Sequence, residues 1–206
     1  AVFGTMAKWA VEIDDVNRLP EILGRAWVTA TTGRPGPVVI ALPEDMLTSL
    51  TDAAPLTAPA RLSEPAPEPF ALTTALEMLA KATHPLILMG GCNWTKAGQT
   101  SLQAFAEASD IPVIAAFRYQ DQFDNFSPVY AGEAGVGMPA NVKRLIAQAD
   151  VILAVNVRFG EMTTDGYTLP TLEHPGQTLV HIHPDPEELG RVYRTDLALC
   201  CAVDEF

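Results

Sequence analysis

Glycines and one arginine follow apolar runs of the sequence, at positions where they could bind a phosphate group. Gly90 and Gly91 come directly after the run 86–89, and Arg158 follows the run 151–155. Glycine lets a ligand approach backbone N–H groups closely, and a guanidinium can hold a diphosphate through two parallel hydrogen bonds. A glycine-rich segment at 132–137 has the same character. These residue types favour binding of a nucleotide.

The same glycines also fit a second interpretation, in which they only turn the chain at strand ends. The fingerprint of three spaced glycines is absent after residue 89, so the sequence gives weak support to a nicotinamide dehydrogenase. His181 and His183 would share one sheet face, but they lack the tight spacing of metal ligands. There is no nucleophile elbow, Walker loop or carboxylate pair suited to acid–base work. We therefore predict no catalytic residue and no metal ligand.

Alternating helical and apolar segments position these residues. Helical periods fall around 72–80, 102–106 and 142–149, and the apolar runs at 86–89, 111–116, 151–155 and 179–182. Short, continuously apolar strands between helices are typical of a parallel sheet that is covered on both faces. We predict an α/β fold over 70–206 with a doubly wound parallel sheet and helices on both faces. Ligands of such sheets bind beyond the carboxyl ends of the strands.

Three finer predictions concern the ends of these elements. Thr74 and Glu77 have the spacing of a capping box for the first helix. Asp185 is expected to cap another helix, with Pro186 at its first position. The adjacent cysteines at 200–201 are expected to be small apolar residues in a last strand.

The first third of the chain has a different organisation. A helical period covers 14–32, Gly33 is placed to end that helix, and the run 38–42 predicts a strand. One helix and one strand cannot close a core, so we interpret 1–48 as the end of a preceding α/β domain. Five prolines lie between 51 and 69, and we interpret 49–69 as a linker to the domain at 70–206. We expect the chain to be a portion of a longer protein.

Composition excludes several classes of partner. The chain has 206 residues, 48% of them hydrophobic, and a formal net charge of -12 without a basic cluster. This charge would repel a nucleic acid, and no apolar stretch approaches the roughly 20 residues of a membrane helix. Three cysteines are too few and too unevenly spaced for a disulfide framework, which favours a reducing, cytoplasmic location.

Six motifs occur in an order that resembles a known family. They are GRPGPVVIALPEDM, KATHPLILMGG, ASDIPVIAAF, SPVYAGEAGVG, ADVILAVNVRF and LVHIHPDPEELG. The set is similar to thiamine-diphosphate-dependent enzymes of the acetolactate synthase and 2-keto acid decarboxylase type. The first motif resembles the end of their pyrimidine-binding domain, and the other five resemble their central domain.

The resemblance implies an activity that this chain does not carry alone. The glutamate that activates thiamine would lie before residue 1, and the motif for Mg²⁺ and the diphosphate would lie after residue 206. The parent enzyme would be a transferase or lyase that decarboxylates a 2-keto acid or joins the aldehyde unit to another carbonyl. The chain's partners would be the pyrimidine-binding and diphosphate-binding domains and further copies in a homo-oligomer.

In this family the central domain binds FAD, ADP or no nucleotide. By resemblance, the positions that would contact a flavin are Gly90, Gly91, Ala115, Ala116, Gly132, Gly135, Arg158 and Asp185. The sequence departs from the flavoprotein pattern at several places. It has alanines where hydroxyls are usual (115–116), Asn156 in place of glycine, His183 in place of an acid and Met162 where a second basic residue is frequent.

Two other interpretations stay open from the sequence. The chain could be a free-standing nucleotide-binding or electron-transfer module, or a structural spacer between cofactor domains. In the second case the apolar face of the helix at 16–30 would be exposed or would pair with another copy. The substrate, the choice between carboligation and decarboxylation, and the oligomeric state are undetermined.

Overall fold

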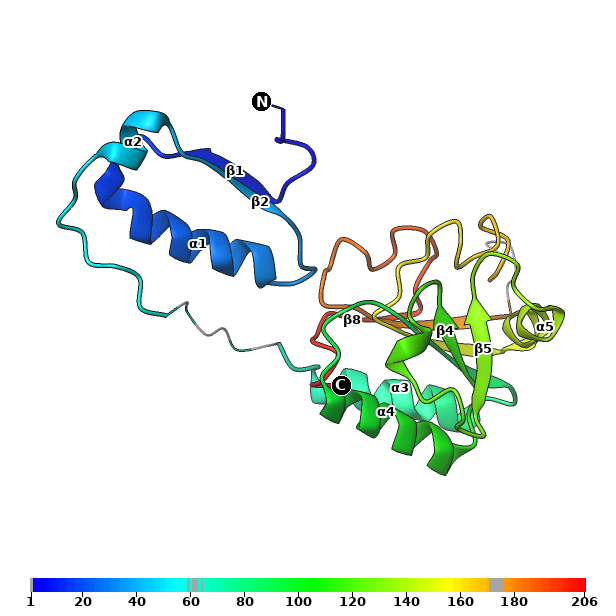
Figure 1. Cartoon of the computed structure of the whole chain (residues 1–206). Coiled ribbons are helices and arrows are strands. Elements are labelled where there is room, and N and C mark those ends of the chain that lie inside the picture. The colour runs from blue at the N-terminus through cyan, green and yellow to red at the C-terminus, as the bar shows by residue number, and fades with distance from the viewer. Residues whose placement is uncertain (1, 59, 61–62, 64, 171–175) are drawn as a thin grey trace. The chain divides into compact units, whose positions relative to one another are not determined.

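The computed structural model describes residues 2–58, 60, 63, 65–170 and 176–206. Its contacts divide the chain into two compact units, Ala1–Ser63 and Glu64–Phe206 (Figure 1). Among the described positions between 49 and 68 there is no helix or strand. None of the described helices is long and apolar enough to cross a membrane.

The first unit contains two parallel strands joined through a helix. Its elements are β1 (Trp9–Glu12), η1 (Val16–Arg18), α1 (Leu19–Thr31), β2 (Val38–Ala41) and α2 (Glu44–Thr48). Trp9 pairs with Val38, so a second strand exists where the sequence predicted only one. The carboxylate of Asp15 caps η1 by accepting a hydrogen bond from the backbone N–H of Asn17. Gly33 follows α1 with a φ of 59°, as expected of a residue that ends a helix.

The second unit is a parallel sheet of six strands in the order β5-β4-β3-β6-β7-β8. The strands are β3 (Pro85–Met89), β4 (Val113–Ala116), β5 (Tyr130–Ala134), β6 (Val151–Val155), β7 (Thr178–Ile182) and β8 (Leu197–Leu199). The helical segments are α3 (Pro69–Lys81), α4 (Lys96–Ser109), η2 (Gln120–Gln122) and α5 (Ala140–Gln148). The predicted α/β fold with a parallel sheet is confirmed. The strand order reverses between β3 and β6, which places the topological switch point there.

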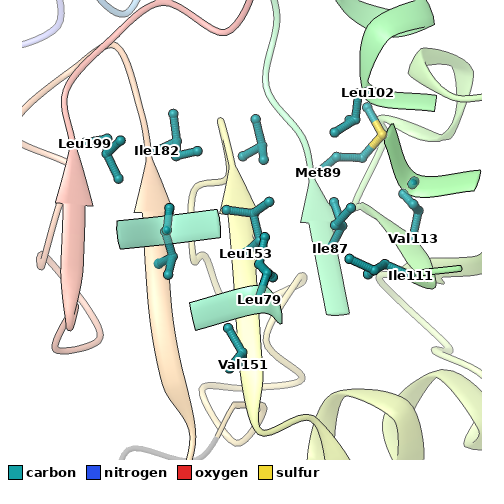
Figure 2. Packing of buried hydrophobic residues seen from close by; sticks show 14 of the residues in the cluster. Leu79, Ile87, Met89, Leu102, Ile111, Val113, Val151, Leu153, Ile182 and Leu199 are labelled. Atoms are coloured by element: carbon teal, nitrogen blue, oxygen red, sulfur yellow. The ribbon is translucent and has the colours of Figure 1, made fainter. Parts of the chain in front are cut away.

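Two hydrophobic clusters cover the two faces of this sheet. In one, Leu79 of α3 and Leu102 of α4 belong with Ile87 and Leu153 of the central strands (Figure 2). In the other, the helix residues are Val142 and Ile146 of α5, which belong with the even-numbered leucines of β3. Successive side chains of a strand point to opposite faces, so a strand buried on both sides is apolar at every position. This explains the continuous apolar runs.

The capping box predicted for α3 is wrong. The carboxylate of Glu68 caps the helix by accepting a hydrogen bond of 2.8 Å from the N–H of Ala71. Thr74 lies inside the helix and donates its hydroxyl to the carbonyl of Phe70. Pro69 occupies the first turn, where its missing N–H removes no helical hydrogen bond, so α3 begins earlier than the apolar period suggested.

The helix predicted after β7 is also wrong, because 186–190 forms turns. Nδ1 of His183 accepts a hydrogen bond from the N–H of Asp185, whose carboxylate accepts one from the N–H of Glu187. Such local side-chain bonds compete with helix formation. The last strand ends at Leu199, so the cysteines at 200–201 follow it rather than lie in it. The edge strand β5 was missed because a glycine and a glutamate interrupt its apolar pattern.

Candidate functional site

All eight residues predicted to contact a nucleotide lie at or near the carboxyl ends of the strands. Gly90 and Gly91 follow β3, Ala115 and Ala116 end β4, Gly132 lies in β5 with Gly135 just after it, Arg158 follows β6, and Asp185 follows β7. The structure brings Gly90 beside Ala116 and Gly91 beside Asn156. Ala115 and Ala116 are both fully buried, so neither offers surface to a ligand.

Gly90 and Gly91 have reasons within the fold to be glycine. A Cβ at Gly90 would lie 2.9 Å from the Cβ of Ala116. Gly91 has a φ of 71°, and a Cβ there would lie 2.3 Å from Cγ of Asn156. A side chain at either position would collide with the neighbouring strand end, and Gly91 also needs its left-handed backbone.

Gly132 and Gly135 are explained in the same way. A Cβ at Gly132 would lie 3.0 Å from Cγ2 of Val142 in α5. A Cβ at Gly135 would lie 2.7 Å from Cδ2 of Phe117. These glycines permit close packing around β5, which accounts for them without any ligand.

Asn156 directly follows β6 and lies over the loop that follows β3. It is 3% exposed and has a φ of 57°. Its side-chain Nδ2 donates a hydrogen bond of 2.8 Å to the carbonyl of Cys92. The indole N–H of Trp94 donates a hydrogen bond of 2.8 Å to the carbonyl of Gly90 in the same loop. Because Asn156 occupies the space next to Gly91, the residues present do not fit a dinucleotide diphosphate at the switch point.

A buried glutamate holds two arginines at this edge of the sheet. Oε1 of Glu188 lies 3.0 Å from Nε of Arg158 and 3.2 Å from Nη1 of Arg191. The Glu188 side chain is 5% exposed, whereas both arginine side chains are half-exposed. Sequence reasoning selected Arg158 alone. The spacing of Glu188 and Arg191 could have indicated their pairing, but nothing in the sequence joins Arg158 to Glu188.

The two histidines of β7 and the following loop are buried beside each other. Their ring centroids are 5.9 Å apart, and Nε2 of His181 lies 2.9 Å from the carbonyl oxygen of Val157. Burial lowers the pKa of His181 to about 4, and the neighbouring His183 acts in the same direction. The hydrogen bond to Val157 and the charge of Glu188 raise this pKa, but they do not outweigh burial. His181 is therefore neutral at physiological pH. In the described part of the chain, no group of three or more His, Cys, Asp or Glu residues could hold a metal ion.

The cysteines that follow β8 have raised pKa values. Burial, with a contribution from Cys200, raises the pKa of the Cys201 thiol to about 11. The thiol of Cys200 also has a raised pKa, chiefly because of burial. A nucleophilic cysteine needs a lowered pKa, so these two are poorly suited to that role.

A cavity of about 280 Å³ lies elsewhere in the second unit. It is lined from α3, from α4 with the loop before it, and from 203–206, and none of the eight predicted residues lines it. The large side chains that line it include Leu72, Trp94, Phe105 and Phe206.

The chain is similar to curated proteins whose names are those of enzymes. It is 28% identical over 204 residues to the probable acetolactate synthase large subunit of Methanocaldococcus jannaschii, covering 96% of the chain and 34% of the relative. It is 31% identical over 193 residues to the sulfoacetaldehyde acetyltransferase of Rhodobacter capsulatus (93% and 32%). It is 27% identical over 201 residues to the glyoxylate carboligase of Escherichia coli O157:H7 (97% and 33%).

The chain spans about a third of the length of these relatives. A family model described as the central domain of thiamine pyrophosphate enzymes matches residues 72–206. This match covers the sheet of six parallel strands and the helices on its two faces. The chain belongs to the thiamine pyrophosphate enzyme family, and residues 72–206 form its central domain.

Proposed function

We propose that this chain is a central, non-catalytic part of an enzyme that depends on thiamine diphosphate. The complete enzyme would decarboxylate a 2-keto acid or join the resulting aldehyde unit to a second carbonyl. The family match over 72–206 carries the proposal. The relatives' names, acetolactate synthase and glyoxylate carboligase, support the carboligase alternative. The buried alanines and self-paired polar groups at the carboxyl edge support a positional rather than a chemical role for this domain.

The cofactor chemistry would belong to other parts of the same protein. When bound in those parts, thiamine diphosphate would supply the nucleophilic carbon and the carbanion stabilisation that decarboxylation of a 2-keto acid needs. Pyrimidine-binding and diphosphate-binding domains, the second with Mg²⁺, would complete the site as partners of this chain. The resemblance also allowed FAD or ADP in the central domain, but Asn156 fills the position beside Gly91 that the diphosphate of either nucleotide would need. We further propose a homo-oligomer and, from three free cysteines, a cytoplasmic location.

An assay of CO₂ release tests the activity. The complete enzyme is supplied with a series of 2-keto acids that includes pyruvate and glyoxylate, with and without thiamine diphosphate and Mg²⁺. We expect turnover that requires both additions, and no turnover by the 206-residue chain alone. Turnover by the chain alone, or turnover of the complete enzyme without thiamine diphosphate, would contradict the proposal. Gas chromatography of the products distinguishes a released aldehyde from a hydroxyketone or hydroxyacid.

A further inference from the structure

The crevice at a topological switch point is where doubly wound sheets take up nucleotides. In this sheet the crevice would lie between the loop after β3 and the loop after β6. We propose that Asn156 closes this crevice and excludes the diphosphate of FAD or ADP from it. Asn156 is thus the residue that decides whether the central domain carries an adenine nucleotide. This inference is independent of the 2-keto acid chemistry proposed above.

The backbone holds Asn156 in the closing position. Its N–H donates a hydrogen bond of 2.8 Å to the carbonyl of Ile182 in the neighbouring strand. Its φ of 57° lies in the left-handed region, which asparagine adopts more readily than most residues other than glycine. Asn156 therefore has a backbone conformation that glycine could also adopt, and it differs from glycine by its carboxamide side chain.

The carboxamide occupies the space that a ligand would need beside Gly91. A Cβ at Gly91 would lie 2.3 Å from Cγ, 2.3 Å from Nδ2 and 2.5 Å from the carbonyl oxygen of Asn156. The Asn156 side chain therefore fills the space in the Cβ direction of Gly91, so a phosphate oxygen cannot take that position. The two loops are therefore in contact where a diphosphate would have to pass between them.

Three polar groups of the loop after β3 already have partners. The carbonyl of Cys92 accepts from Nδ2 of Asn156, and that of Gly90 accepts from the indole of Trp94. The N–H of Gly90, a donor that a phosphate could use, donates to the carbonyl of Val155 at 3.0 Å. Entry of a ligand would break the partly buried hydrogen bonds from Asn156 and Trp94, each worth about 1 kcal/mol when it is not replaced.

Substitution of Asn156 by glycine tests the proposal. Glycine removes the carboxamide and accepts a φ of 57°, so Asn156→Gly keeps the backbone conformation. Asn93→Gly is the matched control, because Asn93 is exposed, has a φ of 72° and lies in the loop after β3. The purified protein and both variants are titrated with FAD and with ADP by calorimetry, and flavin absorption is recorded after gel filtration.

We expect no saturable binding by the wild-type protein or by Asn93→Gly up to millimolar nucleotide. For Asn156→Gly we expect saturable binding of FAD, ADP or both. Its Kd should lie at least about tenfold below the highest nucleotide concentration at which the wild-type protein shows no saturation. Saturable micromolar binding by the wild-type protein would overturn the proposal, and so would a folded Asn156→Gly variant that binds no better. If Asn156→Gly does not fold, Asn156→Ser, which shortens the side chain, takes its place, and a folded Asn156→Ser variant that binds no better than the wild-type protein would overturn the proposal. Saturable binding by the wild-type protein overturns the proposal whichever variant folds.

Discussion

The Nε atom of Arg158 lies 3.0 Å from Oε1 of Glu188, and the glutamate is almost completely buried while the arginine is half-exposed. Arg191 reaches the same oxygen from the other side at 3.2 Å. A buried carboxylate is stable only when cations or hydrogen-bond donors compensate its lost hydration. Arg158, which the sequence suggested for a diphosphate, therefore already stabilises the loops after β6 and β7.

Loss of the Glu188 charge should destabilise the second unit. Glu188→Gln keeps the side-chain size but removes the charge that both arginines share. We expect the free energy of unfolding to fall by about 1–3 kcal/mol, because the hydrogen bonds from Arg158 and Arg191 lose their charged acceptor. Urea denaturation followed by circular dichroism measures the change. Glu187→Gln is the control, since Glu187 is exposed, and equal losses in the two variants would contradict this account.

Asp204 and Gly98 should be energetically coupled. The carboxylate of Asp204 accepts hydrogen bonds of 3.3 Å from the N–H of Thr95, and a Cβ at Gly98 would lie 1.9 Å from its Oδ1. Alanine within a helix is normally more stable than glycine by about 0.5–1 kcal/mol. We expect Gly98→Ala to show no such gain in the wild-type protein, because the carboxylate must move away.

A double-mutant cycle with Asp204→Ala measures this coupling. Once the carboxylate has been removed, Gly98→Ala should recover its stabilising effect, with a coupling energy of about 1 kcal/mol. Effects of the two substitutions that simply add would show that Asp204 does not occupy this space in solution.

The buried His181 should make stability depend on pH. Its pKa is about 4 in the folded protein, against 6.5 for an unperturbed histidine, chiefly because burial disfavours the charged ring. Between these two values the unfolded chain binds more protons, so stability is complete above about 6.5 and decreases as the pH falls toward about 4. The difference amounts to roughly 3 kcal/mol at most.

Variants separate this effect from the titration of other groups. The free energy of unfolding is measured by urea denaturation at about pH 7 and about pH 5. His181→Gln should reduce the difference between the two values. His84→Gln should leave it unchanged, because His84 is exposed. An undiminished difference in His181→Gln would assign the pH dependence to other residues.

Two apolar side chains on α1 should promote self-association. Leu23 and Trp27 are one helical turn apart and are 42% and 54% exposed. Exposed apolar patches are typical of interfaces. We expect the sedimentation coefficient to rise with protein concentration and Trp27→Glu to reduce this rise. Phe126→Glu, which removes an aromatic exposed at 96%, is the control. A concentration-independent coefficient for the wild-type protein would exclude association.

The alternation of strands and helices in 70–206 could be predicted from the sequence because it depends on local periodicity. A strand such as 86–89, buried on both faces, needs an apolar residue at every position, and a helix such as 142–149 needs one apolar stripe. The resemblance of the motif order to thiamine-diphosphate enzymes also came from the sequence, and the family match confirms it. Edge strands were predicted less well, because β5 is interrupted by Gly132 and Glu133.

The residues at the carboxyl edge of the sheet could be located from the sequence. Whether that edge is open to a ligand or filled by other side chains could not. Gly90 and Gly91 seemed open to a ligand because glycine has no side chain and both residues directly follow a strand. Only the tertiary structure places the carboxamide of Asn156 against Gly91, 65 positions earlier in the chain, and joins Arg158 to Glu188. Such contacts depend on strand order and on the paths of loops. Local periodicity contains no information about either, so they were decided by the packing of the whole unit.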